Sequence, residues 1–146
     1  AHWYWCNNRT ALALFLQNQV AEVFAVDIHP GARIGSGIMI DHATGLVVGE
    51  TAIIGENVSI LHSVTLGGIG RGEGDRHPEV GSGVMISAGA KIMGNVKIGD
   101  GVKVGAGSLV IESIPPHTTV VGVPARVVGA PLEGSPSFEM NQNLDV

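Results

Sequence analysis

The chain has 146 residues, of which 45% are hydrophobic, 14% are charged and 22 are glycine, and its formal net charge is -5. This length accommodates one domain with a buried core, and a glycine share about twice the usual ~7% indicates many tight turns. The negative net charge argues against a nucleic-acid-binding protein. No apolar run reaches membrane-spanning length. Cys6 is the single cysteine, which excludes an intrachain disulfide and favours the reducing cytoplasm.

The first segment, residues 8–26, carries apolar side chains at three- and four-residue spacings, which is typical of an amphipathic helix. We expect this helix, with the aromatic cluster Trp3-Tyr4-Trp5 packed on it, to cover the apolar end of the domain that follows. The apolar positions are Leu12, Phe15, Leu16, Val20, Val23 and Phe24.

From residue 27 onward, an aliphatic residue recurs every six positions, a period that fits neither a helix nor a long alternating strand. It fits short strands joined by tight turns, with three hexapeptides closing one coil of a parallel β-helix. Stacked coils would align the aliphatic side chains into an internal column, and the glycine that often follows each one would sit where a larger side chain is crowded. The aliphatic positions are Ile28, Ile34, Ile40, Val48, Ile54, Ile60, Leu66, Val80, Ile86, Ile92, Ile98, Val104 and Val110.

Two breaks interrupt this period. Two extra residues stand between Ile40 and Val48, and eight stand between Leu66 and Val80. The second break is rich in glycine and charge, so residues 67–79 should protrude as a loop that either carries function or is an idle surface loop. We therefore divide the chain into a helical segment (1–26), a β-helix (27–128) and a polar, extended, weakly ordered C-terminal tail (129–146).

Histidines are the main candidates for chemistry. His42 lies inside the first break, and Asp27 precedes it by nearly one coil, so the carboxylate could orient the imidazole as a general base. An ordinary surface ion pair explains the same spacing. A serine nucleophile is disfavoured because no G-x-S-x-G elbow occurs, and the spacing of the histidines lacks the short motifs of a zinc site. We expect no metal.

Specific motifs narrow the choice. D-H-A-T-G at 41–45 and G-D-R-H-P at 74–78 resemble those of the serine acetyltransferases in order and spacing, as do D-I-H-P at 27–30 and G-V-P-A-R at 122–126. The resemblance covers residues 9 to 130. It implies a mainly β, left-handed parallel β-helix of hexapeptide repeats, with residues 1–26 the remnant of an N-terminal helical domain.

The resemblance also implies roles for individual residues. It makes His42 the general base with Asp27 as its partner, Arg76 the ligand of the substrate carboxylate, and His77 a neighbour of the reacting hydroxyl. Further residues are implied in the L-serine pocket, which inhibitory L-cysteine would share, and along the path of acetyl-CoA, a co-substrate rather than a bound cofactor. The pocket residues are Asp41 and Glu50, and the acetyl-CoA residues are Gly68, Ala88 and Ala106.

The same resemblance implies partners. The sites of the family lie between subunits of a homotrimer, two trimers associate through the N-terminal helical domain, and the C-terminal tail binds O-acetylserine sulfhydrylase. Two other functions stay open: an acetyltransferase acting on a sugar or xenobiotic hydroxyl, and a non-catalytic β-solenoid. No nucleic acid or membrane partner is expected.

Overall fold

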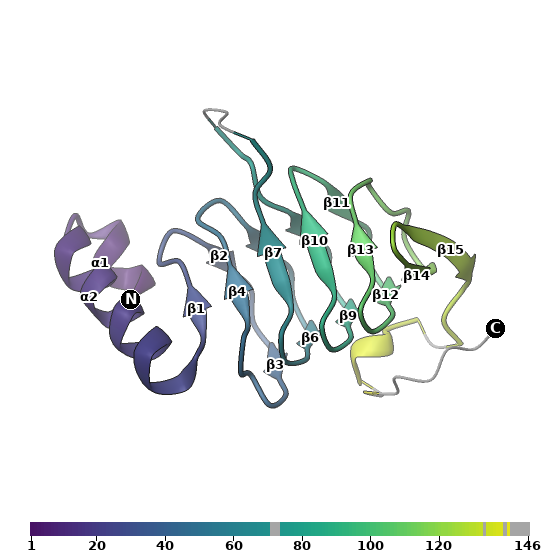
Figure 1. The fold of residues 1–146 in the computed structure, drawn as a ribbon, viewed down its shortest axis with the longest axis horizontal. Helices are drawn as coiled ribbons and strands as arrows, with labels where there is room; N and C mark the ends of the chain where they lie inside the picture. Colours follow the sequence, from purple (N-terminus) through teal and green to yellow (C-terminus); the bar gives the residue numbers. More distant parts are fainter. Residues whose placement is uncertain (71–73, 133, 139, 141–146) are drawn as a thin grey trace.

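The computed structural model describes residues 1–70, 74–132, 134–138 and 140. Two helices stand at one end of a triangular prism of short parallel strands, one loop projects from the prism, and the segment after the last strand turns back along the prism (Figure 1). Residues 71–73 of the predicted loop, and residues 133, 139 and 141–146 of the predicted tail, lie outside the described residues.

The strands form three sheets, one for each side of the prism, and from β1 to β13 successive strands enter the three sheets in turn. Sheet A contains β1 (Asp27–Ile28), β4 (Val47–Val48), β7 (Thr65–Gly67), β10 (Lys91–Met93) and β13 (Leu109–Val110). Sheet B contains β2 (Arg33–Ile34), β5 (Ile53–Ile54), β8 (Glu79–Val80) and β11 (Lys97–Ile98). Sheet C contains β3 (Met39–Ile40), β6 (Ser59–Ile60), β9 (Met85–Ile86), β12 (Lys103–Val104), β14 (Thr119–Gly122) and β15 (Ala125–Gly129).

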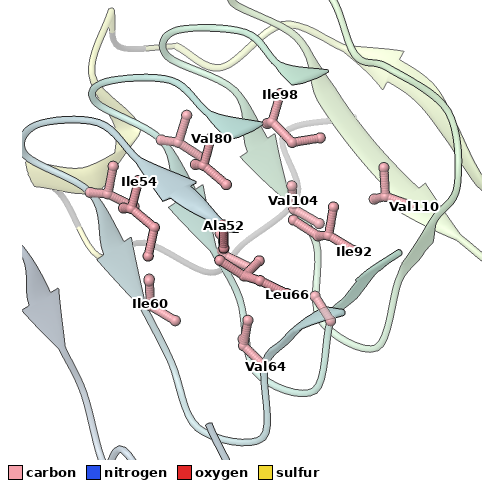
Figure 2. Packing of buried hydrophobic residues seen from close by; sticks show 14 of the residues in the cluster. Ala52, Ile54, Ile60, Val64, Leu66, Val80, Ile92, Ile98, Val104 and Val110 are labelled. Atoms are coloured by element: carbon pink, nitrogen blue, oxygen red, sulfur yellow. The ribbon is translucent and has the colours of Figure 1, made fainter. Parts of the chain in front are cut away.

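The aliphatic column predicted from the six-residue period forms the core. From Val48 to Val110 every member of the column is buried, and the side chains point inward from all three sheets (Figure 2). The first coil differs, because Ile34 is 43% exposed and Ile40 is also exposed. The column is therefore confirmed from its second coil onward, and its first coil is open to solvent in this chain.

Glycine after the aliphatic residue is required by close approach between coils. A Cβ placed on Gly55 would lie 2.8 Å from the carbonyl carbon of Gly81, and one on Gly81 would lie 2.8 Å from the backbone nitrogen of Asp100. Real Cβ atoms do not approach a backbone so closely, so the coils could not stack at this edge with alanine in either position.

The strand register locates the two predicted breaks. Val47 pairs with Thr65 and Lys91 pairs with Leu109, 18 residues apart in each case. Asp27 pairs with Val47 across 20 residues, and Thr65 pairs with Lys91 across 26. The extra two and eight residues leave the register of the strands intact because they are accommodated at corners of the prism.

The N-terminal helices cover less of the apolar end of the β-helix than the apolar periodicity of residues 8–26 predicts. α1 (His2–Cys6) packs against α2 (Thr10–Phe24), and α2 contacts β1. Within α2 only Ala13 is buried, whereas Phe15, Val23 and Phe24 are exposed. The expectation that this helix closes the end of the column is wrong for most of its apolar face. None of the described helices is long and apolar enough to cross a membrane.

The described part of the C-terminal segment is not simply extended. The 3-10 helix η1 (Pro136–Phe138) lies against sheet C, where the Ser59 hydroxyl donates a hydrogen bond of 2.7 Å to the carbonyl oxygen of Ser137. The backbone N–H of Ser137 donates to Gly83 O at 3.3 Å. Pro136 and Ser137 are buried, so this part of the predicted tail is docked on the prism.

Burial along the column predicts a graded response to truncation. Ile54 is 3% exposed and pairs in register with Ile34, which is 43% exposed at the same hexapeptide position of the preceding coil. Ile54→Ala should lower the free energy of unfolding by about 2–5 kcal/mol, because it leaves a cavity. Ile34→Ala is the matched control and should cost less than about 1 kcal/mol. Urea titration followed by circular dichroism measures both, and equal losses would contradict this account of the core.

Candidate active site

The predicted base lies at the corner between sheets C and A, here called the C–A corner (turns 41–46, 61–64, 87–90 and 105–108). His42 and Ala43 both have left-handed backbone conformations, with φ of 60° and 55°. For residues with a Cβ this conformation costs roughly 1–2 kcal/mol each. Such strain persists only where the surroundings impose it, and it concentrates at functional sites.

Backbone hydrogen bonds impose this conformation. Thr44 N–H donates to His42 O at 2.6 Å, and Leu46 N–H donates to Ala43 O at 3.0 Å. Gly45 N–H donates across the coils to Ala25 O at 2.7 Å. The turn that contains the two extra residues is therefore closed on itself and tied to the first coil, and it holds His42 at the outside of the corner.

The carboxylate beside His42 belongs to Asp41. His42 Nε2 lies 3.5 Å from Asp41 Oδ2, and the imidazole is 73% exposed. The ring also meets the ring of His62 edge to face. His42, Thr44, His62 and Ser63 line a hollow of about 350 Å³.

Asp27 is occupied elsewhere. Its Oδ1 accepts a hydrogen bond of 2.6 Å from Nε2 of Gln17 in α2. Within the part of the chain that the structure describes, no hydrogen bond or ion pair joins Asp27 to His42. The near-coil spacing of the two residues therefore does not produce the expected contact here, and their joint catalytic role stays a prediction.

A second cluster lies at the corner between sheets A and B, here called the A–B corner (turns 29–32, 49–52 and the loop 68–78). Arg76 Nη2 donates a hydrogen bond of 2.9 Å to Glu50 Oε2, and both side chains are a little over one-third exposed. A pair so exposed contributes little to stability. It does fix the direction of the guanidinium, whose remaining N–H groups make no hydrogen bond to the described residues.

Thr51 organises the point where the loop rejoins the prism. Its hydroxyl oxygen accepts hydrogen bonds from the backbone N–H groups of Arg76 (3.1 Å) and His77 (3.3 Å), and the hydroxyl donates to His77 Nδ1 at 2.9 Å. The sequence analysis did not single out Thr51 as a site residue. In the sequence, its only signal was its place directly after Glu50, a predicted pocket residue.

His77 is buried and its tautomer follows from its partners. The backbone N–H of Thr51 donates to Nδ1 at 3.2 Å, so Nδ1 is an acceptor and the ring proton sits on Nε2. Burial, followed by the positive charge of Arg76, lowers the pKa of His77 below its usual value near 6.5, while Glu50 opposes this shift. His77 is therefore a neutral group at pH 7 with one N–H to donate.

Two glycines make room for this ring. A Cβ on Gly49 would lie 2.0 Å from both Cδ2 and Nε2 of His77, and one on Gly68 would lie 3.2 Å from Nε2. Gly68, predicted on the acetyl-CoA path, thus belongs to the A–B corner and adjoins Arg76 as well. The structure brings Glu50, Arg76, His77 and Gly68 together.

The other two predicted acetyl-CoA residues lie on the C–A corner with His42. Gly89 N–H donates to His62 O, and Gly107 N–H donates to Ala88 O, each at 2.9 Å, so the turns of successive coils stack. Ala88 and Ala106 therefore follow His42 and His62 along one edge of the prism, and their small side chains keep this edge open.

The two clusters do not meet within one chain. His42 precedes β4 and Glu50 follows it, so the two clusters flank sheet A at opposite corners of the prism (Figure 1). Among the described residues, no three His, Cys, Asp or Glu side chains are grouped to hold a metal ion.

Comparisons with known proteins give this geometry a context. Residues 77–112 match the family model described as bacterial transferase hexapeptide (six repeats). The serine acetyltransferase of Escherichia coli strain K12 is 62% identical over 144 residues, which is 99% of this chain and 53% of that protein. The chain belongs to the serine acetyltransferase family.

Solved structures of serine acetyltransferases have the same fold. The crystal structure of the enzyme from Vibrio cholerae O1 biovar El Tor superposes with a TM-score of 0.97 at 56% identity, covering 99% of this chain and 56% of that one. A serine acetyltransferase in complex with cysteine gives a TM-score of 0.95 at 56% identity, covering 98% of this chain and 56% of that one. The predicted left-handed parallel β-helix is confirmed. The chain spans about half the length of the serine acetyltransferases it matches.

The packing of His77 predicts that Gly49 cannot be replaced. Gly49→Ala should displace the His77 ring and break its bonds to Thr51, lowering the free energy of unfolding by about 1–3 kcal/mol. The φ of Gly49 is not in the left-handed region, so the effect is steric. Gly134→Ala is a control, because a Cβ there meets nothing within 4 Å and should change stability by less than about 0.5 kcal/mol. Chemical denaturation compares them, and a wild-type value for Gly49→Ala would refute the close packing.

The lowered pKa of His77 predicts how stability depends on pH. Below about pH 6.5 this histidine is protonated in the unfolded chain but stays neutral in the folded chain. Stability therefore falls as the pH decreases, until the lowered folded-state pKa of His77 is reached. Above pH 6.5 this contribution is constant. His77→Gln should therefore lose less stability than wild type between pH 7 and pH 5, by at most about 1.4 kcal/mol per pH unit. Urea midpoints at half-unit pH steps measure this, and parallel curves would exclude the proposed burial of a neutral imidazole.

Proposed function

We propose that this chain is the catalytic part of a serine acetyltransferase, which transfers the acetyl group of acetyl-CoA to the hydroxyl of L-serine and releases O-acetyl-L-serine and CoA. The observation that carries the proposal is the position of His42, which has a strained backbone conformation and lies on the same edge of the prism as Ala88 and Ala106. An exposed imidazole in that place has access to an acceptor hydroxyl and to a thioester lying along the edge.

The chemistry needs a base because a serine hydroxyl is a poor nucleophile at neutral pH. His42 would take the hydroxyl proton as the oxygen attacks the thioester carbonyl, and would return that proton to the departing CoA thiolate. A carboxylate beside the ring stabilises the imidazolium that forms between these steps. Asp41 lies in that position here, and Asp27 would serve only if the ring turned toward it and Gln17 released its carboxylate.

The A–B corner fits the amino-acid part of the substrate. The guanidinium of Arg76 can hold the serine carboxylate by two parallel hydrogen bonds, while Glu50 attracts the ammonium group and keeps Arg76 in place. The neutral His77 would present its Nε2–H beside the substrate. L-Cysteine differs from serine only in SH versus OH, so we propose that it occupies the same place as an inhibitor.

Assembly would bring the two corners together. His42 and Arg76 flank sheet A within one chain, so one site requires the C–A corner of one subunit and the A–B corner of its neighbour. A homotrimer satisfies this for three identical sites around one axis. Acetyl-CoA would then lie along Ala88 and Ala106, with Gly68 on the facing loop.

Further associations rest on the family resemblance. The exposed apolar residues of α2 are suited to the contact that would join two trimers when a helical domain precedes this segment. The C-terminal segment, whose last residues lie outside the described ones, would bind O-acetylserine sulfhydrylase. The free Cys6 suits a reducing compartment, and we place the reaction in the cytoplasm.

The test is an assay of thiol release from acetyl-CoA with L-serine, a galactoside or chloramphenicol as acceptor. Of the three acceptors, we expect only L-serine to give turnover. His42→Ala should lower kcat by ~10²–10⁴, the usual value of a general base. Asp27→Asn and Asp41→Asn should each cost less, and the larger loss identifies the carboxylate that orients His42. Cysteine should compete with serine.

Two outcomes would contradict the proposal. Turnover with the sugar or the antibiotic but not with serine would make the chain an acetyltransferase of another specificity. Near-normal serine turnover by His42→Ala would remove the general base, whichever acceptor is used.

A further inference from the structure

A second histidine lies against the proposed base. His62 occupies the C–A corner one coil after His42, and the two turns are joined by the hydrogen bond from Ser63 N–H to Thr44 O at 2.8 Å. The ring centroids of His42 and His62 are 5.8 Å apart with an interplanar angle of 85°. Both rings line the same hollow.

The His42 ring has few other restraints. It is largely exposed, and the carboxylate beside it, Asp41 Oδ2, lies 3.5 Å away, beyond an ordinary N–H···O hydrogen-bond length. The strained backbone fixes where the side chain starts but not how the ring is turned. An edge-to-face contact restricts that rotation, because the positive edge of one ring attracts the negative face of the other.

We infer that His62 is a positioning residue for the reaction: its ring holds the His42 imidazole in the orientation that accepts the serine proton. This inference rests on the proposed function of His42. His62 acts through the shape and quadrupole of its ring, so another aromatic ring in its place should serve, whereas a polar group without a ring should not.

The structure also explains why loss of His62 should be tolerated by the fold. Its side chain is exposed, while the neighbouring Leu61 and Val64 are buried in the column. The backbone bonds that stack this corner, from Ser63 to Thr44 and from Gly89 to His62 O, involve no His62 side-chain atom. Changes in activity can therefore be separated from changes in stability.

The experiment compares His62→Asn, His62→Phe and the control His117→Asn. His117 is an exposed histidine in the turn between sheets B and C, away from the hollow, and Asn tolerates its left-handed φ of 53°. For His62→Asn we expect kcat to fall about two- to tenfold, because one edge-to-face pair can shift the population of His42 ring orientations by that factor. Both KM values should stay within about twofold of wild type, and the melting temperature should not change. His62→Phe should restore kcat, and His117→Asn should match wild type.

A spectroscopic measurement gives a second readout. The ring protons of His42, assigned in NMR spectra by their loss in His42→Asn, should shift in His62→Asn because the neighbouring ring current is gone, and should stay perturbed in His62→Phe. A wild-type kcat for His62→Asn, or a His62→Phe variant as slow as His62→Asn, would overturn the inference. Either result with an active wild type leaves the proposed function standing, whereas an inactive wild type with serine would count against that function itself.

Discussion

Successive coils of this protein approach each other as closely as hydrogen-bonded strands allow, about 4.8 Å. Everything else depends on this spacing. It places Gly55 and Gly81 where a Cβ would strike the next coil, and it stacks the aliphatic side chains from Val48 to Val110 into one buried cluster. Because each coil contacts only its neighbours, the position of every turn is fixed relative to the turns before and after it. Corners thereby become ordered edges on which side chains from distant parts of the sequence line up.

The proposed chemistry occupies the places where this regularity is broken. The two extra residues before β4 produce the strained turn that carries His42, and the eight extra residues after β7 produce the loop that ends in Arg76 and His77. In both cases the neighbouring strands keep their register, so the departure stays local. A rigid scaffold then holds exposed groups in defined directions, which is what a transfer between two bound substrates requires.

Much of the fold could be predicted from the sequence because a period of six is the direct consequence of prism sides that each turn the same hexapeptide positions inward. The two breaks were visible for the same reason. Side-chain partners were not visible. Spacing placed Asp27 near His42 along the chain, but α2 supplies Gln17 to Asp27, and the adjacent Asp41 faces His42 instead. Thr51 was not predicted as a site residue, and His62 was a candidate histidine without an assigned role, because the side-chain contacts of both form between coils. The amphipathic pattern of α2 was also misleading, since periodicity shows that a face is apolar but not what covers it.

The loop between β7 and β8 shows that a long insertion at a corner of the prism costs the fold little free energy. Lengthening the closed segment from 18 to 26 residues, as the pairing of Thr65 with Lys91 requires, adds only a few tenths of a kcal/mol of closure entropy, because that cost grows with the logarithm of length. A solenoid can therefore lengthen, shorten or exchange a corner loop with almost no effect on the column beneath it. Since the proposed acceptor site includes Arg76 and His77 of this loop, a change in loop length offers a route to a different acceptor without rebuilding the core.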